Sequence, residues 1–389
     1  MATEQTLRDW LTLVRLPGIG PSAAAEIRRH YDSPAAFLDA SEAHRQRKGI
    51  RPPIVQAPRG RESVQAGVEA DLAWQADADD RHIVTLDQPN YPASLARIAD
   101  PPPVLFVRGD LAALATPQLA IVGSRHATPG GLHSAGDFAA HLAATGLTIT
   151  SGLALGIDAE AHQGALAAGG QTIAVMATGP DRLYPRENQA LAHEIAAAGA
   201  VVTEMPTGTP VVRGLFPRRN RLISGLSLGV LVIEAGLKSG ALSTAYAALE
   251  QGREALALPG SIHNPVARGC HRLIRNGARL VETADHVVEE LRSLADALTL
   301  ELPDAGPAVG AANATSTDTG DAPAEALDAD YQKVLKEMGH DPISFDRLAE
   351  RVGLTADILS SMLLSLELKG YVTPCNGGRY MRADNRTGG

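Results

Sequence analysis

The chain has 389 residues, of which 44% are hydrophobic and 20% are charged. This composition is typical of globular proteins and excludes a wholly disordered or collagen-like chain, and the length predicts two or three domains. Its two cysteines, Cys270 and Cys375, are too few for a disulfide framework or a four-cysteine zinc site. The chain has no apolar run long enough to cross a membrane and no signal peptide at its start, so we expect a cytoplasmic protein with reduced thiols.

The net charge of −9 is unevenly distributed along the chain. Residues 296–330 carry eight carboxylates and no lysine or arginine, so the rest of the chain is close to neutral. Two clusters contain only positive charges: residues 44–61 hold six lysines and arginines, and residues 213–221 hold four arginines. Local fields matter more to a charged ligand than the sum over the chain. The acidic total therefore does not exclude a nucleic-acid partner.

The composition also indicates where the chain divides. Residues 1–80 are expected to be helical, and within them the run LPGIG at 16–20 leads into a helix-forming stretch. This run fits a helix-hairpin-helix turn whose backbone N–H groups hold a phosphate, and it fits equally well a plain glycine-capped connection. Residues 296–330 are rich in Ala, Gly, Pro and carboxylates, which predicts a disordered acidic linker.

Between these two regions, short apolar runs alternate with helix-forming stretches. Strands are expected over 118–122, 147–150, 172–177, 200–203, 230–233 and 255–258, and helices over 132–144, 158–168, 187–198, 216–226 and 241–251. Apolar strands that alternate with helices of this length predict a parallel sheet covered on both faces. The expected fold class is therefore α/β, a Rossmann-like doubly wound parallel sheet.

The tail, residues 331–384, predicts a winged-helix domain. Helices are expected over 331–338, 345–352 and 355–369, followed by two short strands that flank the Asn376–Gly378 turn. Residues 331–382 hold seven basic and six acidic side chains, and the third helix carries Asp357, Glu367 and only one lysine. A helix that reads duplex DNA is normally more basic. A protein–protein role for this tail is at least as well supported as DNA binding.

Glycine, serine and basic residues follow several of the expected strands. In an open α/β sheet, ligands bind outside the carboxyl ends of the strands, where small residues let backbone N–H groups approach an anion. The segment FPRRNR at 216–221 adds arginines and an aromatic ring. Such a set suits a phosphodiester backbone with unstacked bases, that is, a single-stranded nucleic acid. The candidate binding residues are Gly123, Ser124, Arg125, Ser151, Gly152, Phe216, Arg218, Arg219, Asn220, Arg221, Lys238, Ser239 and Gly240.

Structural explanations compete with the binding hypothesis at several of these positions. The arginines of 216–221 could lie on a solvated helix face or form ion pairs with Glu204 and Glu234. Asp158 and His162 are four residues apart, and we favour a carboxylate–histidine pair over a metal site. Cys270 is interpreted as a buried structural thiol and not as a nucleophile.

The motifs and their order resemble the DNA-processing protein A (DprA/Smf) family. The resemblance rests on AIVGSR at 120–125, SGLALGID at 151–158, FPRRNR at 216–221 and SGALSTA at 239–245, and it continues through LPG at 258–260 and GCHRLI at 269–274. It covers about residues 83–282. It implies a SAM-like helical domain over 1–80, an extended Rossmann domain over 81–295, the linker 296–330 and the winged helix 331–384.

The resemblance implies a single-stranded DNA-binding protein that protects incoming DNA and loads the RecA recombinase during natural transformation and homologous recombination. It implies no catalysis, no cofactor and no metal, and it implies a homodimer formed through the Rossmann domain. Carried over by motif, Gly123, Ser124 and Arg125 contact DNA phosphates, and Arg219–Arg221 and Lys238–Gly240 line the same pocket. Phe216 is the candidate for base stacking, and the helix around Leu273 and Ile274 is the candidate for self-association.

Two other functions remain open at this point. A Rossmann-type nucleotide hydrolase needs a positioned carboxylate base, and only Glu204 and Glu234 lie at expected strand ends. The chain lacks the PGGxGT motif typical of phosphoribohydrolases, and it has neither a GxGxxG dinucleotide fingerprint nor a P-loop. A transcription regulator acting through the winged helix is disfavoured by the acidic third helix.

Overall fold

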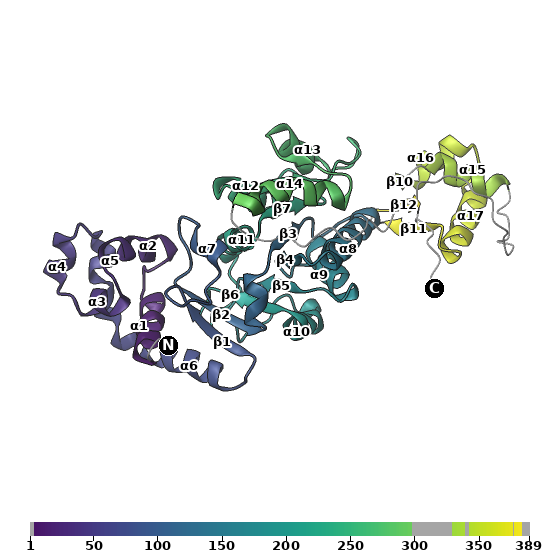
Figure 1. The fold of residues 1–389 in the computed structure, drawn as a ribbon. Helices are drawn as coiled ribbons and strands as arrows, with labels where there is room; N and C mark the ends of the chain where they lie inside the picture. The colour runs from purple at the N-terminus through teal and green to yellow at the C-terminus, as the bar shows by residue number, and fades with distance from the viewer. Residues whose placement is uncertain (1–3, 298–328, 339–341, 376, 383–389) are drawn as a thin grey trace.

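The structure, a computed structural model, describes residues 4–297, 329–338, 342–375 and 377–382 (Figure 1). Nine strands of the described chain form one sheet in the order β1-β2-β6-β5-β4-β3-β7-β8-β9. They are β1 (Arg81–Thr85), β2 (Val104–Gly109), β3 (Gln118–Val122), β4 (Thr148–Ser151), β5 (Thr172–Val175), β6 (Ala200–Thr203), β7 (Gly229–Val232), β8 (Glu254–Ala257) and β9 (Arg279–Leu280).

The seven strands from β6 to β9 are parallel, which confirms the predicted α/β fold class. The sheet also has an extension that the sequence did not indicate. β2 pairs antiparallel with β6, and β1 pairs antiparallel with β2. The sheet is therefore mixed, with an antiparallel hairpin-like edge that leads from the helical region into the parallel strands.

Helices cover both faces of the parallel strands. Successive residues of a strand point to opposite faces of the sheet, so alternate residues belong to two different cores. In β3, Ala120 and Val122 join the core beneath α11 and α12, whereas Leu119 and Ile121 join the core beneath α8 and α9. The helices of this region are α7 (Ala93–Ala96), α8 (Pro129–Ala144), α9 (Ile157–Ala167), α10 (Gln189–Ala198), α11 (Leu215–Leu226), α12 (Gly240–Glu250), α13 (Arg268–Arg275) and α14 (Ala284–Ala297).

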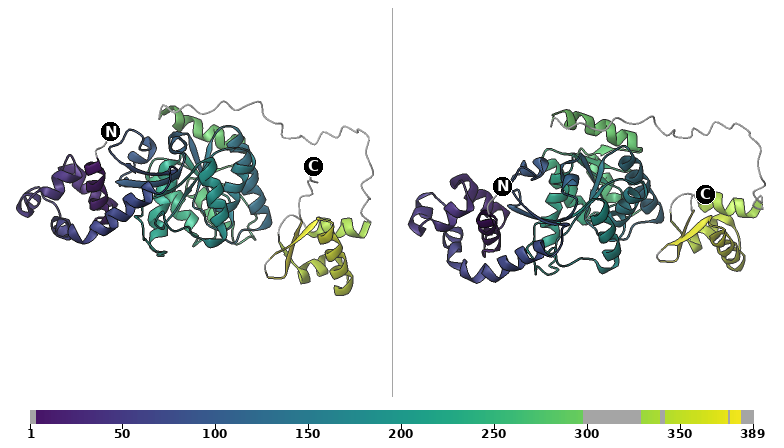
Figure 2. Two further views of the ribbon diagram at one scale, coloured as in Figure 1. Left: turned by 90° about the horizontal axis from the view of Figure 1, so that it is seen from below. Right: turned by 60° about the horizontal axis from the view of Figure 1, so that its bottom comes forward.

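The N-terminal region is helical, as predicted. It consists of α1 (Glu4–Arg15), α2 (Pro21–His30), α3 (Pro34–Asp39), α4 (Glu42–Arg47), α5 (Pro52–Gln56) and α6 (Gln65–Ala76). Its core continues into β1 and β2 through Ile83, Val104 and Phe106, and Figures 1 and 2 show the helices beside these two strands. The antiparallel edge thus exists because it gives the helical region an apolar surface to pack on.

The turn between α1 and α2 has the glycine geometry that both interpretations of the run LPGIG predict. Gly18 has a φ of +82°, which favours glycine, and Gly20 caps α2 with Pro21 in its first turn.

The tail forms the predicted winged helix around a core of its own. Its elements are α15 (Ala329–Met338), β10 (Ile343–Ser344), α16 (Phe345–Val352), α17 (Ala356–Leu368), β11 (Val372–Cys375) and β12 (Arg379–Arg382). The predicted linker, 296–330, lies outside the described residues except at its ends, which belong to α14 and α15. Within the described part of the chain, no helix is long and apolar enough to cross a membrane.

Candidate nucleic-acid interface

The strand order places a topological switch point between β3 and β7. From β3 the chain adds β4, β5 and β6 on one side, and it then returns to place β7, β8 and β9 on the other side. At such a point the loops that follow the two central strands separate and leave a crevice at the carboxyl edge of the sheet. The loops here begin at Gly123, after β3, and at Ile233, after β7.

A cavity of about 600 Å³ occupies this crevice. Its walls are the loop after β3, the loop after β7 with the start of α12, and one face of α11. Nine of the thirteen candidate binding residues line it: Gly123, Ser124, Arg125, Phe216, Arg219, Asn220, Lys238, Ser239 and Gly240. The other four, Ser151, Gly152, Arg218 and Arg221, do not.

Two glycines allow the backbone to close this crevice tightly. A Cβ on Gly123 would lie 2.6 Å from the Ile157 side chain, so the loop after β3 packs directly on the start of α9. Gly156, which caps α9, has a φ of +79°, and a Cβ there would lie 2.4 Å from the carbonyl oxygen of Ser124. Larger residues would push the loop after β3 away from the cavity.

The chain's own carboxylates occupy two of the helix N-termini at this edge. Glu234 accepts hydrogen bonds at the start of α8 from Thr128, from the backbone N–H at 2.8 Å and the hydroxyl at 2.7 Å. Asp158, in the first turn of α9, accepts from the backbone N–H groups of Gly152 and Ala154 at 3.2 and 3.4 Å. A carboxylate already supplies the negative charge that each helix start favours. Neither start is free for an external anion.

The start of α12 is different. Ser239 caps the helix by accepting from the Ala241 N–H at 3.3 Å, and the Cβ position of Gly240 faces open space. Lys238 is exposed beside it, and Arg125 is exposed on the facing loop. Within the described residues neither cation forms an ion pair. An open helix N-terminus and two unneutralised cations therefore share one cavity, which is the arrangement that an anion requires.

Phe216 adds an aromatic surface to the cavity. The Arg125 guanidinium carbon lies 5.6 Å from the centre of the Phe216 ring, within the range of a cation–π contact. This contact orients the Arg125 side chain along the cavity wall. The cavity thus offers positive charge and an apolar ring side by side.

Arg219 lines the cavity but is fully buried. Its Nη1 donates to the carbonyl oxygen of Gly152 at 2.6 Å and to that of Val175. Burial lowers the pKa of Arg219 to about 10, and the nearby Asp158 carboxylate opposes this shift. The side chain therefore ties α11 to the ends of β4 and β5. Asn220 acts similarly, since its Nδ2 donates to Ser243 Oγ at 2.8 Å on α12.

Arg218 and Arg221 form the ion pairs that the sequence left open as an alternative. Arg218 Nε lies 3.1 Å from Oε1 of Glu204, and Arg221 Nη2 lies 2.6 Å from Oε2 of the same carboxylate. Glu204 is buried just after β6, and both arginines pair with it, Arg221 largely buried and Arg218 partly exposed. Ser151 is also buried, and its hydroxyl donates to the carbonyl oxygen of Ile121 at 2.6 Å.

The basic cluster 44–61 is largely neutralised inside the helical region. Arg45 is buried and donates to three backbone carbonyl oxygens, those of Phe37, Ala40 and Val55. Arg51, Arg59 and Arg61 pair with acidic side chains, Glu26, Glu42 and Asp39 respectively. Of the six cationic side chains, only those of Arg47 and Lys48 form no ion pair or hydrogen bond in the described chain, and the Lys48 ammonium lies 6.0 Å from the centre of the Tyr31 ring.

The predicted pair of Asp158 and His162 is wrong. The two side chains have different partners, because His162 points into the core and its Nδ1 lies 2.6 Å from Oγ1 of Thr172. That hydroxyl donates to the carbonyl oxygen of Ile149, so it accepts the Nδ1 proton of His162. Among the described residues no cluster of three metal-binding side chains occurs. Burial, with a smaller contribution from Arg219, lowers the pKa of His162 to about 3.

We expect His162 to make the fold sensitive to acid. The unfolded chain binds a proton at His162 below pH about 6.5, whereas the folded chain does not until pH about 3, so acid favours unfolding across this window. His162→Asn removes this pH-dependent contribution to the free energy of unfolding. The difference in unfolding free energy between wild type and His162→Asn, from urea titrations, should therefore shrink by about 1 kcal/mol from pH 7 to 5.5. A difference that stays constant would contradict the assignment.

Cys270 is a buried structural thiol, as predicted. It is fully buried in the core beneath α13, and burial raises its pKa to about 12. The thiolate that a nucleophile requires is therefore disfavoured. Leu273, expected at a self-association surface, also belongs to this core, and Ile274 is half-buried against it. The expectation was wrong for Leu273, because α13 turns that side chain towards the sheet.

The family model for DNA recombination-mediator protein A matches residues 82–292, and the DprA winged helix domain matches residues 319–378. The chain belongs to the DNA recombination-mediator protein A family. It is 38% identical to Protein Smf of Escherichia coli over 375 residues, which cover 96% of this chain and 95% of that protein.

Other relatives support the same family assignment. Over 209 residues the chain is 43% identical to the DNA processing protein DprA of Bacillus subtilis, covering 54% of this chain and 70% of that one. The solved structure of DprA from Streptococcus pneumoniae superposes with a TM-score of 0.63 at 33% identity, covering 72% of this chain and 97% of that one. A DprA structure from Helicobacter pylori, described for its single-stranded DNA binding mode, gives a TM-score of 0.50 at 31% identity, covering 55% of this chain and 96% of that one.

Proposed function

We propose that this protein binds single-stranded DNA in the cavity at the switch point, without catalysing a reaction on it. The observation that carries the proposal is the open start of α12 between Lys238 and Arg125, beside the Phe216 ring. The helix start and the cations suit a phosphate, and the ring suits an unstacked base. The single-stranded DNA binding named for the Helicobacter pylori relative supports the same ligand.

Neither candidate base of the hydrolase alternative lines the cavity. Glu204 pairs with two arginines, and Glu234 accepts hydrogen bonds from Thr128, the N-cap of α8. Desolvation raises the pKa of Glu234, although the hydrogen bonds from Thr128 and Asn264 oppose the shift. A general base must reach the proton that it removes, and these two carboxylates are held elsewhere.

The test is a fluorescence-anisotropy titration of a labelled oligo-dT strand and of a duplex of equal length, at two salt concentrations. We expect tighter binding to the single strand. The logarithm of the affinity should fall linearly with the logarithm of the salt concentration, because each neutralised phosphate releases counterions. Equal binding to both DNAs, or binding that does not depend on salt, would contradict the proposal.

A finer proposal is that the bound strand is protected and handed to the RecA recombinase during transformation and recombination. The names of the relatives, which refer to DNA processing and recombination mediation, support this role. Nuclease digestion of a labelled strand, and the lag before RecA filaments form on it, test the two parts. We expect the protein to slow digestion and shorten the lag, and no effect on either would remove the role.

We also propose that the protein forms a homodimer through the Rossmann region. With Leu273 in the core, the accessible apolar candidates near α13 are the half-buried Ile274 and the exposed Leu280 on the edge strand β9. Sedimentation equilibrium should give twice the mass of the chain. Ile274→Asp combined with Leu280→Asp should lower it, and an unchanged dimer would place the contact elsewhere.

Deleting residues 331–389 is expected to leave single-strand affinity within about threefold of the full chain. The winged helix has a core of its own, its third helix α17 has one acidic residue in its first turn, and none of its residues lines the cavity. The same anisotropy titration measures the effect. A loss of most of the affinity would make the tail the main DNA contact.

A further inference from the structure

The loop that follows β5 carries an exposed aromatic side chain between two arginines. Tyr184 is 40% exposed, and Arg182 and Arg186 flank it on the surface. Among the described residues neither arginine forms an ion pair or donates a side-chain hydrogen bond. Exposed aromatic rings beside unneutralised cations suit the binding of a single nucleic-acid strand, because bases stack on the rings and phosphates contact the cations.

This loop continues the surface of the cavity. The centre of the Tyr184 ring lies 5.9 Å from that of Phe216, and the two rings are tilted by 56°. Phe216 in turn lies beneath Arg125. Arg125, Phe216 and Tyr184 therefore form an unbroken line of contacts that runs from the cavity onto the loop after β5.

The segment after β6 lies beside the loop after β5 and extends the same surface. The Gly208 N–H donates to Asp181 Oδ1 at 2.9 Å, and the Gly179 N–H donates to the carbonyl oxygen of Thr209 at 3.1 Å. Further along, Val211 and Val212 are 42% and 47% exposed, and the exposed Arg213 follows them. We call residues 181–186 and 211–213 together the ledge.

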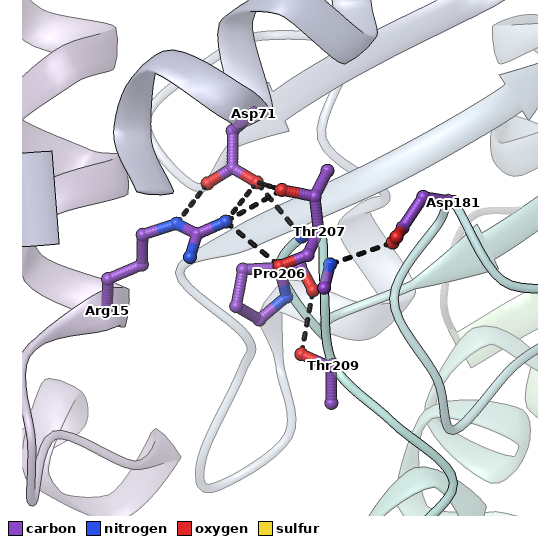
Figure 3. A network of polar contacts seen from close by, with 7 residues as sticks. Arg15, Asp71, Asp181, Pro206, Thr207 and Thr209 are labelled. Carbon is purple, nitrogen blue, oxygen red and sulfur yellow. Dashed lines mark hydrogen bonds and ion pairs between the residues drawn. The ribbon is translucent and has the colours of Figure 1, made fainter. Parts of the chain in front are cut away.

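The helical region holds the ledge in place (Figure 3). Asp71 of α6 is fully buried and accepts from the N–H of Thr207 at 3.0 Å and from its hydroxyl at 2.8 Å. Arg15 of α1 pairs with the same carboxylate at 2.5 Å and donates to the Thr207 hydroxyl at 2.9 Å. These buried, hydrogen-bonded charges fix Thr207, and the adjacent Gly208 bonds Asp181, so the helical region anchors one end of the ledge.

We propose that the ledge is a second DNA subsite, across which the strand runs after it leaves the cavity. A base stacks on Tyr184, and Arg182, Arg186 and Arg213 contact phosphates on either side. The ledge holds one acidic residue, Asp181, which accepts from the Gly208 N–H, against the three arginines Arg182, Arg186 and Arg213. The inference rests on the proposed function and extends it to residues outside the cavity.

The stacking part is tested with two strands of equal length, oligo-dT and an abasic strand that keeps the phosphates but has no bases. Tyr184→Ala should weaken binding of oligo-dT about 5- to 150-fold. It should leave binding of the abasic strand unchanged. Tyr184→Phe, which keeps the ring, should bind oligo-dT as the wild type does. Equal losses on both strands would mean that Tyr184 only supports the loop, and would overturn the stacking role.

The phosphate part is tested by charge removal at matched sites. Arg182→Gln with Arg186→Gln should reduce the slope of log affinity against log salt by about 1.4, since each single-strand phosphate contact contributes about 0.7. The control, Arg28→Gln with Arg29→Gln, removes two exposed arginines from α2 of the helical region and should leave the slope unchanged. If wild type binds but neither ledge variant differs from it, the ledge proposal fails and the cavity stands. If wild type binds no single strand, the proposed function itself fails.

Discussion

Replacing Arg219 with methionine is expected to lower the free energy of unfolding by about 3–5 kcal/mol. The change removes the guanidinium that donates to the Gly152 and Val175 carbonyl oxygens. It also leaves the buried Asp158 carboxylate without the cation that offsets part of its desolvation. Arg219 and Asp158 influence each other through their charges without a direct ion pair, and removing one of two buried opposite charges is costly because the other is left uncompensated. Urea denaturation followed by circular dichroism measures the loss.

Arg218→Met provides the matched control for this prediction. Arg218 is next to Arg219, yet its side chain is partly exposed, and its partner Glu204 keeps Arg221. We expect Arg218→Met to cost about 1 kcal/mol or less. Asp158→Asn added to Arg219→Met should recover part of the larger loss, because the unpaired charge is then gone. A cost below 1 kcal/mol for Arg219→Met alone would show that Arg219 does not hold the strand ends together.

The contrast between these neighbours shows where sequence reasoning reached its limit. A run of four arginines within 213–221 predicts a basic surface, but a helix distributes its residues around an axis. Arg218 and Arg221 are three residues apart and share a face, and both meet Glu204. Arg219 lies on another face and enters the core. The i, i+3 spacing was visible in the sequence, but the position of Glu204 depends on the order of the strands.

Six of the seven parallel strands were predictable for a local reason. Each coincides with a short apolar run that ends at small or polar residues, and β3 and β6 match the expected ranges throughout. The seventh, β9, is an exposed pair of residues without such a run, and it was missed. The antiparallel strands β1 and β2 were missed because their side chains pack against the N-terminal helices, and such tertiary contacts are not visible in the local sequence. Tyr184 was missed for a similar reason. Only the folded chain brings it to Phe216, 32 positions further along.

The turns that form the candidate site were predictable from the sequence, but the carboxylates that neutralise some of its helix starts were not. Parallel strands place their carboxyl ends at one edge, so the turns had to converge. The sequence did not show that Glu234 and Asp158 would fill the starts of α8 and α9 and leave only α12 open among these three helices. Because only the start of α12 is open among them, Arg125 and Lys238 are the cations that face a ligand.

Arg125→Ala and Lys238→Ala are each expected to weaken single-strand binding about 10- to 150-fold, which corresponds to about 1.5–3 kcal/mol for a hydrogen bond to a charged group. Both cations are exposed in the cavity, and within the described chain neither has a carboxylate partner to compensate its loss. The thermal unfolding midpoint should stay close to that of the wild type, since neither charge is buried. Anisotropy titration at several salt concentrations should also show a shallower salt dependence for each variant.

Arg47→Ala combined with Lys48→Ala is the control for nonspecific loss of charge. These are the two cations of the 44–61 cluster without an ion pair in the described chain, and they lie on α4 and just after it, outside the cavity. If attraction by net charge alone governed binding, this double variant, which removes two charges, would weaken binding at least as much as either single variant in the cavity. We expect a loss of less than threefold, because a single strand held at the start of α12 depends on which charges lie beside it. A loss as large as that of Arg125→Ala or Lys238→Ala would remove the cavity as the binding site.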